Sequence, residues 1–340
     1  MTRTTPPRPL DPEALFPGIE AHRRTCTRLH PRPGTPTVAE SSVGGPLLWP
    51  AGEPWPVCTA PHRKGRGYLL ADVRAGDGAR RGKHAPWIAD EDPVPLLAAA
   101  QLYARDVPDL PAGPDGCDLL QVLWCPFEAH GPDRTVEVVL RWRRAADVVD
   151  PLPGDGLPAP EVVGREACVP RPCVLDPERI VEYEYADLLP RKLRKAVHAW
   201  EDSQTGREEA WAEGEPDYRD FASYEEYQAA AAAYPEQPEI LSYWHHLSIA
   251  PGWKVGGYAS WHLTDPARVD CGSCGTPMRP LLTVDAGEWD GITTWVPHED
   301  RESIGVPGAA TPTGVHLGRD EMRVFTCPAN PAHPHRLSFQ

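Results

Sequence analysis

Proline is the residue that most limits how this chain can fold. The 340 residues include 42 prolines, roughly twice the usual frequency. Because proline lacks a backbone N–H and fixes its φ angle, it interrupts helices and is excluded from the middle of a sheet. The sequence therefore predicts short strands joined by many loops, with few long helices. Hydrophobic residues make up 41% of the chain, which is enough for a substantial core.

We expect one integrated domain with four regions along the chain. Residues 1–36, rich in Pro, Thr and Arg, are interpreted as an N-terminal arm. Residues 37–165 form a first half-repeat, residues 166–240 a linker and helical insert, and residues 241–340 a second half-repeat. Within the first half-repeat, residues 118–124 are typical of a buried strand, and residues 135–142 alternate like a half-buried strand.

The insert is expected to hold two helices. One begins after Pro190 and places Leu189, Leu193, Val197 and Trp200 on one stripe. Its basic run, 191–195, is interpreted as a solvated helix face. The other begins after Ser223, where a glutamate three residues later predicts a capping box. Residues 202–220, between them, are polar and acidic and are predicted to form an exposed loop.

Four short sequence words recur in the same order in the two halves. They are Val43–Gly45 before Trp49 and Val255–Gly257 before Trp261; then Cys58 and Cys271; then Pro95–Leu97 and Pro280–Leu282; and finally Gln121–Pro126 and Arg323–Pro328. We interpret this order as an internal duplication in which two half-domains share one core. The paired glycines predict a left-handed backbone or a close backbone approach, with an ordinary turn as the alternative.

A zinc site is the strongest chemical prediction. The predicted ligands are Cys271, Cys274, Cys327 and His333, with His335 as the alternative fourth ligand. Three thiolates and one imidazole form a closed tetrahedral set typical of structural zinc, and such soft ligands disfavour magnesium and calcium. The alternatives are a reduced cysteine pair without metal and a thioredoxin-like redox pair. The redox pair requires a helix after the first cysteine, whereas Gly275 and Pro277 lead into a strand.

The repeat suggests a second zinc site in the first half. Its ligands would be Cys58, His62, Cys125 and His130, which map onto the ligand clusters of the second half. Such a Cys₂His₂ set is also typical of structural zinc. The alternative is that the two cysteines are small buried residues and the two histidines are surface polar groups. We therefore expect one structural Zn²⁺ and treat a second as an open alternative.

The recurring words resemble the YwqG-like family of bacterial proteins of unknown function, in its actinobacterial-type branch. The resemblance covers residues 40–340 and rests on Val43–Pro46 with Trp49 and Pro50, Ala250–Gly257, Pro280–Val284 and Glu288–Gly291. It implies an α+β fold with an internally duplicated, mostly antiparallel sheet core, here carrying a zinc-ribbon-like clasp. Some members look as if they sit near toxin systems, which implies an immunity-like role. The family carries no catalytic residues over to this chain, and the Cys/His clusters, the N-terminal arm and the helical insert depart from its pattern.

Net charge limits the expected partners, and the distribution of apolar residues limits the expected location. The net charge of −15 argues against a duplex nucleic-acid partner, which requires a basic face, and against an anionic membrane surface. The chain has neither a long apolar run nor an apolar signal-peptide segment, so we expect a cytoplasmic protein.

The absence of common catalytic and nucleotide-binding motifs limits the activities that we expect. The sequence lacks a nucleophile elbow, a P-loop, a zincin motif and a Rossmann fingerprint. We therefore expect a non-enzymatic protein that binds a protein or small-molecule partner, and no catalytic residue is assigned. The runner-up is a hydrolase-like enzyme with a Trp/His-lined pocket that uses His245, Glu288 or a zinc centre with an open coordination position. His245 and His246 are expected to point to opposite faces of a strand, one into the core and one exposed. Glu288 and Asp290 are expected on a solvated turn, with an acid/base pair on one strand face as the alternative. A zinc ribbon that binds nucleic acid is a third hypothesis, disfavoured by the charge.

Overall fold

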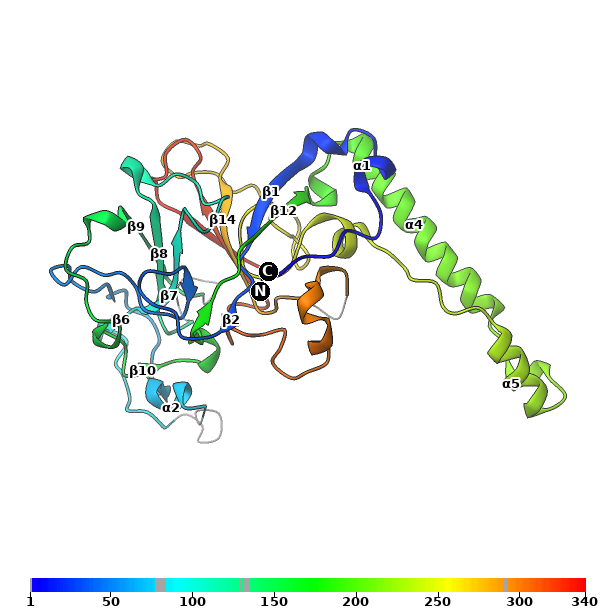
Figure 1. Ribbon diagram of the computed structural model, residues 1–340, viewed down its shortest axis with the longest axis horizontal. Coiled ribbons are helices and arrows are strands. Elements are labelled where there is room, and N and C mark those ends of the chain that lie inside the picture. The colour runs from blue at the N-terminus through cyan, green and yellow to red at the C-terminus, as the bar shows by residue number, and fades with distance from the viewer. Residues whose placement is uncertain (1, 77–83, 129, 131–134, 290–292) are drawn as a thin grey trace.

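The computed structural model describes residues 2–76, 84–128, 130, 135–289 and 293–340, and Asp290 of the expected carboxylate pair lies outside them. The fold is a mixed α+β arrangement with two six-stranded sheets. One sheet has the order β12-β1-β13-β14-β15-β16 and the other has the order β2-β11-β3-β7-β8-β9. Figure 1 shows the strands forming the body of the molecule, from which helices α4 and α5 project to one side.

The first sheet consists of β12 (Glu178–Tyr183), β1 (Arg23–Arg28), β13 (Lys254–Gly256), β14 (Arg279–Asp285), β15 (Glu321–Thr326) and β16 (Arg336–Phe339). The second consists of β2 (Arg32–Pro33), β11 (Cys173–Val174), β3 (Ser42–Val43), β7 (Leu97–Tyr103), β8 (Leu119–Trp124) and β9 (Val138–Arg143). Two small ladders pair β4 (Val57–Cys58) with β6 (Val94–Pro95), and β5 (Tyr68–Leu69) with β10 (Val162–Val163). The helices are α1 (Pro12–Leu15), α2 (Leu70–Arg74), α4 (Arg191–Gly214) and α5 (Tyr224–Ala233).

Four strands in each sheet follow the same antiparallel order, β3-β7-β8-β9 in one and β13-β14-β15-β16 in the other. The second strand of each set carries a register shift, between Ala98 and Ala100 in β7 and between Pro280 and Leu282 in β14. Immediately after the shift, Ala100 pairs with Val43 in one sheet, and Leu282 pairs with Val255 in the other. The two valine–glycine words therefore take the same place in the two ladders.

The proline–leucine words do not match in the ladders. Leu97 pairs with Trp124, the last residue of β8, and Arg279 pairs with Thr326, the last residue of β15. Leu97 therefore corresponds to Arg279 and not to Leu282. The match of Pro95–Leu97 with Pro280–Leu282 is therefore wrong by three positions, because leucine pairs are common in buried strands. The words that end at Pro126 and Pro328 keep their match, since β8 and β15 end at Trp124 and Thr326.

The paired glycines occupy positions where a side chain would not fit. Gly44 has φ +64°, and a Cβ there would lie 2.5 Å from the carbonyl oxygen of Arg171. Gly257 has φ +69°, and a Cβ there would lie 2.2 Å from a carboxylate oxygen of Glu182. The prediction of left-handed backbone and close approach is confirmed at both positions.

One hydrophobic core joins the two sheets. Its buried residues come from both ladders, including Val43, Val122 and Trp124 from one and Val255 and Val324 from the other. The buried rings of Trp124 and Trp253 lie 6.3 Å apart between centroids. The buried side chains of the two sheets therefore belong to one continuous core.

The N-terminal segment is not a separate arm. β1 lies inside the first sheet, between β12 and β13. Its polar residues are matched by distant groups: the hydroxyl of Thr27 donates to Asp109 at 2.9 Å, and Arg28 donates to the carbonyl oxygens of Trp295 (3.0 Å) and Glu288 (2.9 Å). The interpretation of residues 1–36 as an arm is wrong for this strand because local composition does not reveal such partners.

The linker and insert also contain parts of the sheets. β11 and β12 lie within residues 166–240, so this region is a linker only in part. The expected stripe is confirmed, since Leu189, Leu193 and Val197 are buried and pack in one cluster with Trp200. The predicted loop at 202–220 is wrong over residues 202–214, because α4 continues to Gly214. That helix fills the proline-free stretch before Pro216.

The tip of the projecting helices folds back on itself. The rings of Trp211 and Tyr234 lie 5.6 Å apart, and the indole N–H of Trp211 donates to the carbonyl of Pro235 at 2.8 Å. α5 begins as predicted: Ser223 is the N-cap and accepts from the backbone N–H of Glu226 at 3.2 Å. Within the part of the chain that the structure describes, no helix combines the length and apolar character needed to cross a bilayer.

Candidate metal centres

The ligands predicted in the second half come together in the structure. One ligand atom from each of Cys271, Cys274, Cys327 and His333, here called the C-terminal tetrad, lies within 4.8 Å of the others. The Sγ atoms of Cys274 and Cys327 are 3.6 Å apart, and Cys271 Sγ is 3.3 Å from His333 Nδ1. Sulfur atoms bound to one tetrahedral zinc at about 2.3 Å would be separated by about 3.8 Å. The four ligand atoms of the tetrad are therefore close enough together to hold one metal ion.

A tight turn aims the first two thiols. The backbone N–H of Gly275 donates to the carbonyl of Cys271 at 2.8 Å, and the N–H of Cys271 donates to the carbonyl of Thr276 at 2.9 Å. The Thr276 side chain is hydrogen-bonded to Cys274 Sγ at 3.3 Å. Hydrogen bonds from the Thr276 side chain and backbone lower the pKa of Cys274 to about 6. This thiol is therefore poised to bind as a thiolate.

The structure selects between the two candidate histidines. His333 belongs to the tetrad, whereas His335 lies beside the backbone of Val138 and the carboxylate of Glu137. Burial lowers the pKa of His335. The alternative with His335 as the fourth ligand is therefore not the arrangement that the structure contains.

The ligands proposed for the first half also come together. Cys58, His62, Cys125 and His130, here called the N-terminal tetrad, place one ligand atom each within 4.8 Å of the others. His62 Nε2 lies 3.3 Å from Cys58 Sγ and 3.5 Å from Cys125 Sγ, and His130 Nε2 lies 3.7 Å from Cys58 Sγ. Burial, with the nearby His130 and Lys64, lowers the pKa of His62 to about 4. The neutral imidazole that results is the form that binds a metal.

Sequence reasoning missed Glu137, which stands beside the N-terminal tetrad. Its Oε2 lies 3.7 Å from His130 Nδ1 and 3.5 Å from Cys58 Sγ. The histidine thus turns one ring nitrogen to the thiols and the other to a carboxylate, as metal-binding histidines commonly do. The alternation of residues 135–142 could have shown that Glu137 faces away from the core, although no spacing ties it to the cysteines.

The two tetrads occupy the same place in their hairpins. Cys125 follows the last residue of β8, and Cys327 follows the last residue of β15. Cys58 lies on β4, whose partner β6 leads into β7. Cys271 begins the turn closed by the pairing of Asp270 with Pro277, which leads into β14. All nine cysteines are unbridged, so thiols remain for coordination.

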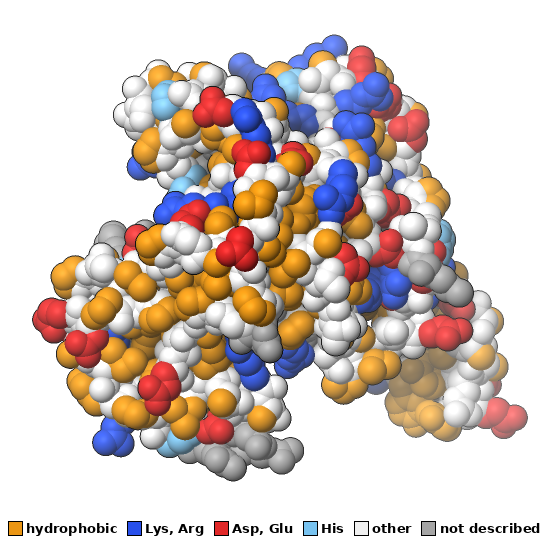
Figure 2. All heavy atoms as spheres, turned by 60° about the vertical axis from the view of Figure 1, so that its left-hand side comes forward, with side chains coloured by type: hydrophobic (Ala, Val, Ile, Leu, Met, Phe, Trp, Pro, Cys, Tyr) orange, Lys and Arg blue, Asp and Glu red, His pale blue; other side chains and the backbone are white. Residues whose placement is uncertain are grey.

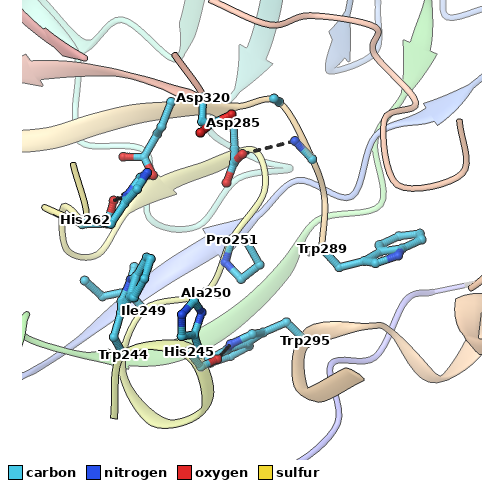
Figure 3. A pocket seen from close by; sticks show the side chains of 14 residues that line it. Trp244, His245, Ile249, Ala250, Pro251, His262, Asp285, Trp289, Trp295 and Asp320 are labelled. Atoms are coloured by element: carbon cyan, nitrogen blue, oxygen red, sulfur yellow. Dashed lines mark hydrogen bonds between the residues drawn. The ribbon is translucent and has the colours of Figure 1, made fainter. Parts of the chain in front are cut away.

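A cavity of about 380 Å³ lies away from both tetrads. Figure 3 shows Asp285 and Asp320 on one side of it and Trp244, His245 and Trp295 on the other. The expectation that His245 and His246 lie on a strand is wrong, because both belong to a π-helical turn, Tyr243–Ser248. His246 is buried and accepts from the backbone N–H of Ser242 at 2.9 Å.

Glu288 is buried rather than exposed on a turn. One oxygen accepts from the backbone N–H of Trp253 at 3.0 Å, and the other, without a hydrogen-bond partner among the described residues, lies 3.8 Å from His30 Nδ1. Burial raises the pKa of Glu288 to about 7. His30 turns its Nε2 to Glu178 at 3.2 Å, and burial lowers the pKa of His30 to about 4, so Glu288 faces a neutral imidazole. A structural role as a buried carboxylic acid follows.

Glu288→Gln is expected to change how stability depends on pH. A raised folded-state pKa means that the folded protein binds the extra proton, so this stabilisation is complete below about pH 4.3 and is lost as pH rises towards 7. The amide cannot titrate, so the variant should gain on the order of 3 kcal/mol relative to the parent across that window. Urea unfolding of both proteins at each pH measures the difference. Parallel pH profiles would contradict the assignment.

No family model matches this chain, and no curated protein matches it.

Proposed function

We propose that this chain is a zinc-stabilised, non-enzymatic binding protein with one structural Zn²⁺ in each tetrad. The two ions would clasp equivalent hairpins of an internally duplicated core. The observation that carries the proposal is that two Cys/His tetrads gather at the same end of hairpins with the same strand order. The partner is a protein or a small molecule.

The ligand chemistry supports zinc. Each tetrad supplies four nitrogen or sulfur ligands, which select zinc over the oxygen-seeking ions magnesium and calcium. Four protein ligands close the coordination shell and leave no position for a reacting water. The ions are therefore assigned to holding the fold, in which a β-hairpin and a loop far apart in sequence are tied together.

Duplication and the YwqG-like relationship belong to the proposal. The common strand order, the register shift in β7 and β14 and the equivalent places of Val43 and Val255 support a duplication. The antiparallel α+β core agrees with what the YwqG-like resemblance implies. The immunity-like role rests on that resemblance alone.

A binding role is favoured over the hydrolase alternative. In the cavity, the Ser260 hydroxyl lies 3.3 Å from His262 Nδ1, as a nucleophile and base would. However, that hydroxyl donates its hydrogen to the buried Glu321 at 3.0 Å. A serine whose proton is held by a carboxylate is not activated by the histidine. His245 and Glu288 do not form a pair either, since only His245 lines the cavity.

The distribution of charge on the surface also supports a protein or small-molecule partner. On the face drawn in Figure 2, hydrophobic side chains gather across the middle, with basic and acidic side chains interspersed around them. This face is not the continuous basic surface that duplex nucleic acid requires. The mixed surface is compatible with a protein or small-molecule partner.

Metal analysis of the purified protein tests the proposal. We expect close to two zinc ions per chain. Cys125→Ser and Cys327→Ser should each remove one ion, because each lies in a different tetrad. Cys168→Ser is the matched control, since Cys168 is equally buried and belongs to neither tetrad. A zinc content below about one-tenth per chain would overturn the zinc assignment.

A further inference from the structure

The cavity of Figure 3 is acidic. Asp285, Asp320 and Glu321 line it, and none of the described lining residues is Lys or Arg. Glu321 has an ion-pair partner in Arg323, 3.3 Å away, which offsets its charge. Asp320 is exposed and lies 3.6 Å from His316, a longer contact than that of Glu321 with Arg323. Asp285 and Asp320 therefore give the cavity a net negative charge.

Asp285 is held in a fixed orientation. Its two oxygens accept from the backbone N–H groups of Gly252 (3.0 Å) and Gly287 (3.1 Å). Burial, and next the charge of Glu321, raise the pKa of Asp285 to about 6. Glu321 is buried, and its Oε1 faces Arg323 Nε without a hydrogen bond between the two atoms. A positive group that entered the cavity would relieve the desolvation and repulsion of these carboxylates.

Aromatic rings form the opposite wall. The Trp244 ring is stacked on His262, with centroids 5.2 Å apart and planes at 14°. Trp295 is fixed by its indole N–H, which donates to the carbonyl of His245 at 2.5 Å. The Trp295 ring already contacts one cation, the guanidinium of Arg8, 5.1 Å from its centroid. Tryptophan faces attract cations, more strongly where water is excluded.

We propose that this cavity binds a small organic cation through its ammonium group, which is neutralised by Asp285 and Asp320 and contacts Trp244 and Trp295. This inference rests on the proposed binding role and names its ligand class. An anion would be repelled by the carboxylates. A neutral sugar would stack on the rings but leave the two charges unneutralised. A bare metal ion has no site here, because among the described residues only the two tetrads bring three or more His, Cys, Asp or Glu ligand atoms within 4.8 Å of one another.

Titration calorimetry on the full-length, zinc-assayed protein tests this inference. The probes are choline and 3,3-dimethylbutan-1-ol, which have the same shape and differ in charge. We expect choline to bind at least about ten-fold more tightly than the neutral alcohol, because only choline carries a charge that the two aspartates attract. Equal binding of the two probes, or no choline binding at millimolar concentration, overturns the proposal. Glucose serves as a neutral stacking ligand, and preferential glucose binding would also overturn it.

Variants locate the binding. Asp320→Asn and Trp244→Leu should each weaken choline binding by roughly five-fold or more. Asp187→Asn is the matched control, because Asp187 is also an exposed aspartate, 3.7 Å from His198, and it does not line the cavity. Choline affinity that is unchanged in both cavity variants overturns the assignment. Zinc content measured in the same samples separates failure of this site from failure of the metal centres.

Discussion

Cys274→Ser is expected to remove one zinc ion and to lower the thermal unfolding midpoint by more than about 10 °C. Structural zinc contributes folding free energy directly, about 10 kcal/mol or more in small zinc domains, which rivals the whole net stability of a typical domain. Cys274 is exposed, so the serine itself loses little packing and the effect reports the metal. Differential scanning fluorimetry and metal analysis measure the two quantities.

Cys117→Ser is the control for this prediction. Cys117 is partly exposed and belongs to neither tetrad. The thermal unfolding midpoint of Cys117→Ser should therefore stay within about 2 °C of that of the parent. A chelator added to the parent should lower the midpoint at least as far as Cys274→Ser does, because it removes both ions. If the two cysteine variants behave alike, or the chelator has no effect, the C-terminal tetrad does not hold a structural metal.

Glu182→Ala is expected to cost about 3–5 kcal/mol of unfolding free energy. Glu182 and Lys254 are both buried in the first sheet, with the ammonium 2.6 Å from the carboxylate. The same carboxylate accepts the backbone N–H groups of Ala250 (2.9 Å) and Tyr258 (2.8 Å). Burial alone would lower the pKa of Lys254, but Glu182 and neighbouring groups outweigh it and raise that pKa. Removal of Glu182 leaves a buried ammonium without its counter-charge.

A double-mutant cycle separates the ion pair from general packing. Glu182→Gln should also destabilise the protein, whereas Glu182→Gln combined with Lys254→Met should recover part of the loss, because no charge is then buried. Urea unfolding of the parent, the single variants Glu182→Gln and Lys254→Met, and the double variant gives the coupling free energy. A double variant that is no more stable than Glu182→Gln would contradict the role of the pair.

The sequence predicted which cysteines and histidines come together more fully than it predicted the fold. Cysteines and histidines at short spacings are local signals, and their echo between halves led from Cys271 and Cys327 to Cys58 and Cys125. The strand at 118–124 and the helix stripe that includes Leu193 and Val197 could also be predicted, because their hydrophobic patterns are strong. Glu137 had no such signal, since its place beside His130 depends on how β9 and the preceding loop pack.

Other elements depend on partners distant in sequence. β1 contains three arginines and two threonines, and it is a strand because Asp109 and the carbonyls of Glu288 and Trp295 satisfy its polar side chains. α4 extends past residue 202 because its distal part is supported by the returning segment at Tyr234 and Pro235. Local composition cannot report either kind of support.

The position of β1 governs the order in which this protein can fold during synthesis. Cys26 in β1 pairs with Ile180 on one side and with Gly256 on the other. The strand therefore leaves the ribosome long before either neighbour exists, and its sheet closes only after residue 256 has been made. Such long sequence separations slow folding and leave strand edges open in the meantime. The polar, arginine-rich character of β1, which hid it from sequence analysis, protects that open edge from pairing with other chains.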